Sequence, residues 1–300
     1  MSSAARLRSS ALSWNLWAEL EMQMPIDILV PLVTYPDPLD QAALGPLVDY
    51  VDVLEPTLTA VPIEVDIPPV SSPFALGADY TVLSRQAESG SREVAREFGT
   101  RLRELTERAG VLAFVTPVRS QPLSIPTRIA ELARTHDLTI VPYDPEIADS
   151  RAIAEAAMFS SGRPVLVFPV RPLEVLEPDV VAIAWDGSRA AARALNDARV
   201  WLQKARRVLV LAVTDDKAMP DDWAAGVLAH LERVGIKAEP VTGRLEGRAV
   251  GEALQRLALS QDATLLVMGA YGHNRLREFL LGGATRSVLE RPLLPVLMSY

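Results

Sequence analysis

An internal repeat constrains the fold of this chain more than any other feature of its sequence. Three landmarks each occur twice, in the same order along the chain. They are PIDILVPLVTYP from Pro25 and PDVVAIAWDGS from Pro178, DLTIVPYD from Asp137 and DATLLVMG from Asp262, and GRPVLVFPV at 162–170 and ERPLLPVLMSY at 290–300. Short β-branched apolar runs of this kind are typical of parallel strands that are buried on both faces. Matched landmarks in one order indicate a tandem duplication.

The second half of the chain alternates between strand and helix patterns. Strands are predicted at 178–185, 207–213, 236–241, 263–268 and 294–299, and helices at 188–204, 221–234 and 249–259 and after the glycine-rich loop. Ser188 is a plausible cap for the first of these helices. Alternating strands and helices predict a parallel sheet with helices on both faces and right-handed crossovers.

The first half fits the same order. Strands are predicted near 26–33, 57–65, 111–117, 138–143 and 165–170, and helices near 39–53, 91–109 and 124–136. Its extra residues fall around 67–95, where Pro68, Pro69 and Pro73 indicate a loop before the helix resumes. We therefore expect two α/β domains, 25–172 and 178–300, each with a five-stranded parallel sheet.

Composition excludes several classes of protein. The formal net charge of -8 argues against a nucleic-acid or anionic-membrane partner, because such partners are held mainly by clustered Lys and Arg. No run approaches the roughly 20 apolar residues that span a bilayer. The absence of cysteine excludes disulfides and thiolate metal sites and agrees with a cytoplasmic location. His136, His230 and His273 are too few and too scattered for a metal centre, so no metal site is expected.

Residues 1–24 precede the first landmark and allow two interpretations. They can be a flexible or misassigned extension, with Met22 or Met24 as the true start. They can also be an amphipathic docking helix that uses Trp14, Leu16, Trp17 and Leu20.

Glycines gather near the C-terminal end of the chain. The stretch 268–289 places Gly269 and Gly272 after a predicted strand, and Gly282 and Gly283 before a predicted helix. Glycines after a strand let backbone N–H groups approach a ligand closely, and a helix N-terminus attracts phosphate. Simple turns would also use glycine, so the two interpretations stay open at this point.

The spacing of these glycines resembles that of the universal stress protein family. MGAYGHNRLREFLLGGATRSVLERPLLPVLMSY at 268–300 and AIAWDGSRAAARAL at 182–195 carry the resemblance, and the repeat is similar to the family's two-domain bacterial members. ATP-binding members carry G-x-x-G-x9-G-[ST]; Gly269, Gly272 and Gly282 match, but Gly283 stands where Ser or Thr is expected.

The resemblance implies a fold and a partner arrangement. Each half would be Rossmann-like, of the adenine nucleotide alpha hydrolase-like type. Family subunits pair through their last strands, so 165–170 and 295–300 would join the two halves in an intrachain pseudo-dimer; a homodimer of the whole chain is also plausible.

The resemblance also implies one nucleotide site, in the second half. Asp186, beside Ala184, would face adenine, and Val213 would meet the base through its backbone. Met268 and Gly269 would lie against the ribose. The phosphates would be surrounded by Gly272, Gly282, Gly283 and Ala284. A carboxylate such as Asp186 can accept a hydrogen bond from the adenine amino group, although it could equally serve only to cap the following helix.

The first half lacks these residues. In the landmark alignment Val33 falls opposite Asp186, and Asp144 falls opposite Gly269, within PYDPEIADSR. Carboxylates and prolines would repel phosphate and deny it backbone donors, so we expect no equivalent ATP site there.

Three functions are therefore weighed. The first is a stress-response regulator that binds ATP or AMP, with or without magnesium, in its second half. The second is a slow ATP hydrolase or phosphotransfer enzyme, although no paired base and nucleophile is visible in the sequence and no catalytic residue is named. The third is a nucleotide-free scaffold for protein interactions.

Overall fold

The structure is a computed structural model that describes residues 25–69, 77–170, 177–215, 220–270 and 283–300. The predicted N-terminal extension at 1–24 and two predicted phosphate ligands, Gly272 and Gly282, lie outside the described residues.

The described residues of the first half form six strands and the helices between them. The strands are β1 (Asp27–Val33), β2 (Thr57–Val65), β3 (Leu112–Val115), β4 (Val118–Ser120), β5 (Leu138–Tyr143) and β6 (Val165–Pro169). The helices are η1 (Gln41–Ala43), α2 (Leu44–Asp52), α3 (Gly77–Ala109), η2 (Pro122–Ser124), α4 (Ile125–Ala133) and α5 (Ala148–Ser160). The run predicted as one strand at 111–117 is shorter, and β3 and β4 pair one after the other with β2.

The second half repeats the alternation. Its strands are β7 (Val180–Ala184), β8 (Arg207–Val213), β9 (Ala238–Gly243), β10 (Leu265–Gly269) and β11 (Val296–Ser299). Its helices are α6 (Arg189–Asp197), α7 (Arg199–Lys204), α8 (Ala225–Arg233), α9 (Val250–Leu259) and α10 (Gly283–Glu290). The long helix predicted at 188–204 is divided at Ala198 into α6 and α7.

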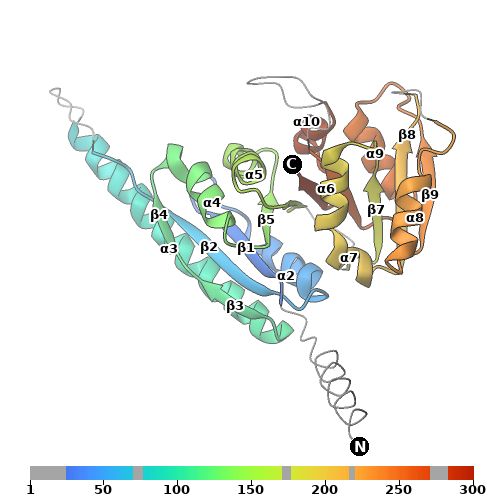
Figure 1. The fold of residues 1–300 in the computed structure, drawn as a ribbon. Coiled ribbons are helices and arrows are strands. Elements are labelled where there is room, and N and C mark those ends of the chain that lie inside the picture. The colour runs from blue at the N-terminus through green and yellow to red at the C-terminus, as the bar shows by residue number, and fades with distance from the viewer. Residues whose placement is uncertain (1–24, 70–76, 171–176, 216–219, 271–282) are drawn as a thin grey trace, which may run out of the picture.

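All strands belong to one eleven-stranded sheet in the order β3-β2-β1-β5-β6-β11-β10-β7-β8-β9, with β4 beside β2 (Figure 1). Among the described strands, pairing is parallel within each half, and only β6 and β11 pair antiparallel. The fold prediction is therefore confirmed: two parallel α/β halves join through their last strands as an intrachain pseudo-dimer. Each last strand covers an edge that the other half would leave open.

The sheet register shows which residues of the two halves are equivalent. Leu166 faces Leu297 at the centre of the β6–β11 ladder. Ile140 pairs with Leu166 as Val267 pairs with Leu297, so Ile140 and Val267 are equivalent residues. By the next ladder outward in each half, Val30 and Ile183 are equivalent as well. The landmark alignment is thus correct for β1 and β7. It is wrong by two residues for β5 and β10, where Pro142, not Asp144, is the counterpart of Gly269.

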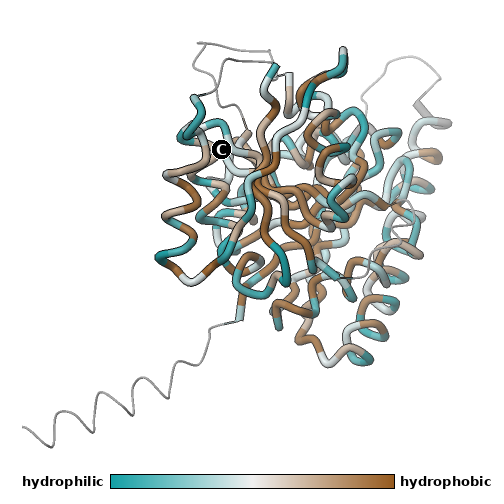
Figure 2. Tube along the Cα trace, turned by 90° about the vertical axis from the view of Figure 1, so that its right-hand side faces the viewer, coloured by the Kyte–Doolittle hydropathy of each residue, from teal (hydrophilic) through white to brown (hydrophobic). Residues whose placement is uncertain are grey.

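Two apolar layers form the core, one on each face of the sheet, and both run through the two halves. One layer joins Phe98 and Leu102 of α3 to Trp201 of α7. The other joins Ile129 of α4 and Met158 of α5 to Val288 of α10. The strands between them are apolar along most of their length, as Figure 2 shows by their brown colour. Such burial on both faces is what continuous β-branched runs predict.

Two helices differ from the sequence prediction. Helix α3 begins at Gly77 rather than near residue 91, so its first turns extend beyond the sheet (Figure 1). Helix α5, at Ala148–Ser160, has no counterpart among the predicted helices. None of the helices in the described part of the chain is long and apolar enough to cross a membrane.

Candidate functional site

Four of the predicted site residues, Ala184, Asp186, Val213 and Gly269, lie at or just beyond the carboxyl ends of β7, β8 and β10. Strand β7 pairs with β8 on one side and with β10 on the other. The chain moves outward from β7 to β8 and β9 and then returns across β7 to β10, so the strand order reverses between β7 and β10. In open α/β sheets, ligands bind beyond the carboxyl ends of the strands at such a point.

Asp186 follows β7 and is exposed at this edge. Its carboxylate oxygen Oδ1 accepts a hydrogen bond of 2.9 Å from the backbone N–H of Ser188. The helix cap is Ser188 itself, whose Oγ accepts from Ala191 N at 3.1 Å, as the sequence predicted. Asp186 is therefore not the cap of α6, and it orders the turn that carries the cap.

Three other predicted residues lie at or next to the ends of β7, β8 and β10. Val213 is the last residue of β8, and its side chain is almost fully buried. Ala184 ends β7 and is half-buried, whereas Met268 of β10 is buried in the core. The structure thus brings Ala184, Asp186 and Val213 to one edge, and it places the Met268 side chain in the core rather than at the surface.

Gly269, at the end of β10, is required by the fold itself. A Cβ added there would lie 2.5 Å from the carbonyl carbon of Ala190 and 2.5 Å from the backbone nitrogen of Ala191. Real Cβ atoms do not approach backbone so closely, so only glycine lets β10 end directly against the first turn of α6. A close approach to a ligand is not needed to explain this glycine.

Gly283 differs from Gly269. It begins α10, is exposed, and a Cβ added there would meet nothing within 4 Å. The next residue, Ala284, is half-buried, and its carbonyl accepts from Ser287 Oγ at 3.1 Å. The first N–H groups of a helix lack partners within the helix, and the helix dipole favours an anion beside them.

Gly251 fixes the position of this helix, and the sequence analysis did not single it out. A Cβ on Gly251 of α9 would lie 2.2 Å from the carbonyl oxygen of Ala284 and 2.3 Å from Ser287 Oγ. The backbone of α9 at Gly251 therefore lies directly against the backbone of Ala284 and the side chain of Ser287, at the start of α10. An isolated glycine inside a helical pattern was the available signal, since such a glycine costs helix stability unless close contact requires it.

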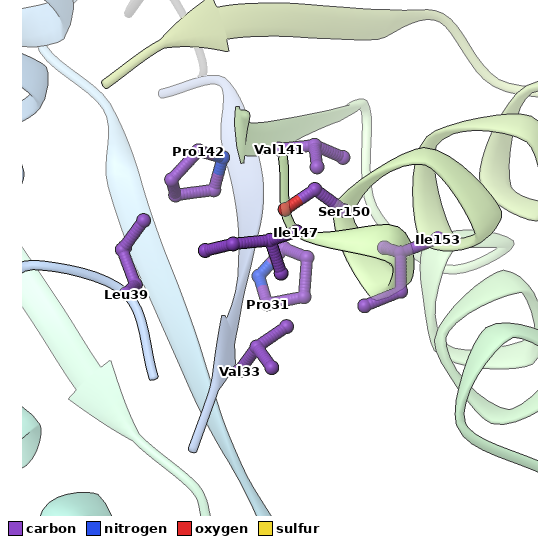
Figure 3. A pocket seen from close by; sticks show the side chains of 8 residues that line it. All are labelled: Pro31, Val33, Leu39, Val141, Pro142, Ile147, Ser150 and Ile153. Carbon is purple, nitrogen blue, oxygen red and sulfur yellow. The ribbon is translucent and has the colours of Figure 1, made fainter. Parts of the chain in front are cut away.

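The equivalent crevice of the first half is filled by apolar side chains (Figure 3). Its lining residues are Pro31, Val33, Leu39, Val141, Pro142, Ile147, Ser150 and Ile153. The cavity volume is about 10 Å³, space on the order of one water molecule. By the sheet register, Pro31, Val33 and Pro142 are the counterparts of Ala184, Asp186 and Gly269. The crevice that would receive a ligand in one half is thus closed in the other.

A sequence profile described as the universal stress protein family matches residues 139–299, more than half of the chain. The chain belongs to the universal stress protein family. The match begins in β5 of the first half and runs through the second half to β11.

Solved structures with similar folds include other members of this family. A universal stress protein from Archaeoglobus fulgidus DSM 4304 is 19% identical, with a TM-score of 0.62, over 90% of this chain and 95% of that one. A functionally unknown protein from Pseudomonas aeruginosa PAO1 is 18% identical, with a TM-score of 0.52, over 93% of both chains. A putative universal stress protein from Pseudomonas aeruginosa UCBPP-PA14 is 18% identical, with a TM-score of 0.52, over 93% of this chain and 94% of that one. No curated protein sequence matches the chain at a significant level. These likenesses show the fold over nearly the whole length.

In this family member, two tyrosines link the halves by hydrogen bonds. Tyr143 Oη donates to the carbonyl of Leu289, near the end of α10, at 2.7 Å, and Tyr50 Oη donates to the carbonyl of Thr264 at 3.0 Å. Burial raises the pKa of Tyr143 to about 12 and the pKa of Tyr50 well above 10.0. Both phenols therefore stay protonated as donors at neutral pH.

Proposed function

We propose that this universal stress protein binds ATP or AMP in its second half and acts in the stress response as a nucleotide-dependent regulator. One observation carries the proposal: Ala184 ends β7, with Asp186 two residues later, at the point where the strand order reverses, and Val213 ends the neighbouring strand β8. Family membership supports the same proposal. The domains that we propose are 25–172 and 178–300.

The chemistry of this edge suits an adenine nucleotide. Asp186 is an exposed carboxylate that can accept from the amino group of adenine, and Ala184 beside it leaves room for a flat base. The open N-terminus of α10 at Gly283 and Ala284 offers backbone donors to phosphate. Met268 and Gly269 would contribute backbone to the ribose side, and Gly272 and Gly282 would complete the phosphate cradle. Magnesium would accompany ATP through its phosphates.

The first half supplies structure rather than a second nucleotide site in this proposal. Pro31 and Val33 fill the crevice, and the remaining cavity volume is too small for a base or a phosphate. We also propose a cytoplasmic location and no nucleic-acid or membrane partner, in line with the net charge of -8. A homodimer of the whole chain would add to the intrachain pseudo-dimer.

A nucleotide-free scaffold is the second candidate, and one observation favours it. Gly269 is explained by its contact with α6, so one of the three glycines that match the phosphate-binding pattern serves the fold. The two candidates differ in what they predict for purified protein: only the nucleotide-binding protein retains or takes up ATP or AMP.

Calorimetric titration of the full chain with ATP and AMP, with and without magnesium, tests the proposal. We expect binding tighter than about 1 mM, which corresponds to about 4 kcal/mol. Asp186→Ala should weaken it, whereas Asp144→Ala, at the first half's edge, should not. If neither nucleotide binds below about 1 mM, the scaffold is the better description. Phosphate release that requires Asp186 would instead support the slow ATP hydrolase.

A further inference from the structure

The edge strand β3 carries an apolar face that is open to solvent. Leu112 is 58% exposed and Phe114 is 53% exposed, while the residues between and after them, Ala113 and Val115, point to the other face and pack against the core. We call Leu112, Phe114 and the neighbouring half-buried Thr57 and Thr59 of β2 the β3 face. In the sheet, Thr57 pairs with Leu112 and Thr59 with Phe114, so these four side chains form one patch.

The second half shows how the same position is normally protected. By the sheet register, the counterparts of Leu112 and Phe114 in β9 are Lys237 and Glu239. Both are exposed, and the Glu239 carboxylate pairs with Arg207 at 2.8 Å. Charged residues on an edge strand discourage association, and β3 lacks them on this face.

The helices that cover this face of the sheet, α4 in the first half and α9 in the second, also differ in how far they reach toward the edge strand. Helix α9 reaches the edge strand of its half, where the side chain of Leu257 lies against Gly243 of β9. Helix α4, its counterpart, packs against α5 and contacts the sheet mainly over β1. The first half therefore has an apolar edge face and a covering helix that is placed too far inward to bury it.

The N-terminal segment of the same chain has the composition and the position to cover this face. Residues 11–20 read ALSWNLWAEL, with Glu19 as their single charge. The chain enters the sheet at Asp27, which pairs with Thr57, which in turn pairs with Leu112. The entry point therefore lies two strand spacings, about 10 Å, from the β3 face. The five residue steps from Leu20 to Pro25 span roughly 17 Å when the chain is extended, which is sufficient.

We propose that residues 11–20 dock on the β3 face, with Trp14 and Trp17 against Leu112 and Phe114. A segment tethered so close has a high effective concentration at the face, so it competes well with a second copy or another protein. Docking removes apolar surface of both partners from water. It also completes in the first half the edge protection that charges provide in the second half.

Hydrogen exchange of the full chain, followed by mass spectrometry, tests this docking. The test variant is Leu112→Lys/Phe114→Glu, which copies Lys237 and Glu239 onto β3. We expect exchange of residues 11–20 and chymotrypsin cleavage at Trp14 and Trp17 to become at least about tenfold faster, as for an undocked segment. The control is Leu123→Lys, at another exposed leucine outside the β3 face, which should change neither rate.

The reciprocal variant keeps the test decisive if the first variant folds poorly. Trp14→Ser/Trp17→Ser leaves the sheet untouched and should speed exchange across 111–117. Equal exchange of residues 11–20 in the wild type and in Leu112→Lys/Phe114→Glu would overturn the proposal. Loss of a wild-type dimer in that variant, without a change at residues 11–20, would overturn it too and would assign the face to a second copy.

Discussion

The two halves share one ladder of strands but treat the same crevice in opposite ways. In the first half, Pro31 and Val33 close it with apolar side chains. In the second half, the small Ala184 and the exposed Asp186 take those positions. The fold thus accepts either apolar side chains that close the crevice or a small and a charged residue at the same positions. The sheet alone therefore does not dictate the residues at the crevice of the second half.

The comparison also corrects how the glycines are explained. Pro142 occupies in the first half the position of Gly269, which shows that the strand itself does not need glycine. What needs it is the first turn of α6, which lies directly against the end of β10. Gly283 has no such neighbour. Of the described glycines in the motif, Gly283 is therefore the one that no contact in the fold requires.

The largest expected effect separates these two glycines. Gly269→Ala should lower the free energy of unfolding by about 3 kcal/mol, because its Cβ would press into the backbone of α6. Gly283→Ala should leave it unchanged or raise it by roughly 0.5 kcal/mol, because alanine favours a helix and meets no neighbour. Urea unfolding of both variants measures the difference. Equal destabilisation by the two variants would show that the contact between Gly269 and α6 is not the cause.

The contact between the halves gives the next effect. Tyr143→Phe should lower the free energy of unfolding by about 2 kcal/mol, because the buried carbonyl of Leu289 loses its donor. Tyr50→Phe, which removes the bond to Thr264, is the matched change on the other face of the sheet and should act in the same direction. Chemical unfolding measures both variants. A neutral effect of both would mean that the halves are held by their apolar layers alone.

The pKa of Tyr143 adds a pH test to this variant. The folded protein raises this pKa to about 12 from 10.0, so above pH 10 the unfolded chain loses the phenolic proton first. The contribution of the raised pKa to the free energy of unfolding is complete below pH 10 and is lost as the pH rises toward 12. The stability of the wild type should therefore fall more steeply between pH 10 and 12 than that of Tyr143→Phe.

A smaller effect is expected on nucleotide binding, for a variant that makes the second half resemble the first. Asp186→Val introduces the residue found at the equivalent position, Val33, and should weaken ATP and AMP alike by at least about tenfold, or 1.4 kcal/mol, because the adenine amino group loses its acceptor. Asp186→Asn keeps an oxygen acceptor, both for the adenine and for Ser188 N, and should lose less. Calorimetry measures the affinities; a loss confined to ATP would place Asp186 at the phosphates instead.

The sequence predicted the strands well, because buried parallel strands consist of short β-branched runs, and this pattern depends little on distant residues. It did not predict the start of α3, since the residues from 80 to 90 are largely exposed and the segment lacks an apolar stripe to mark it. The register of β5 against β10 was shifted by two residues because the matched aspartates, Asp137 and Asp262, precede their strands by different distances. The role of Gly269 could not be foreseen, because it depends on where α6 packs.

The smallest expected effect restores the family pattern at the one described position where this chain departs from it. Gly283→Ser places a hydroxyl at the exposed start of α10, where an added Cβ meets nothing within 4 Å. One added hydrogen bond to phosphate contributes about 0.5–1.5 kcal/mol, so ATP affinity should rise about two- to tenfold. Gly283→Ala, which adds the carbon without the hydroxyl, is the control. AMP, whose phosphate is nearer the ribose, should gain less than ATP if the hydroxyl reaches the outer phosphates. Equal affinities of the Ser and Ala variants for ATP would instead indicate that the phosphates do not reach the start of α10. The difference between the crevices of the two halves would then concern only the binding of the base.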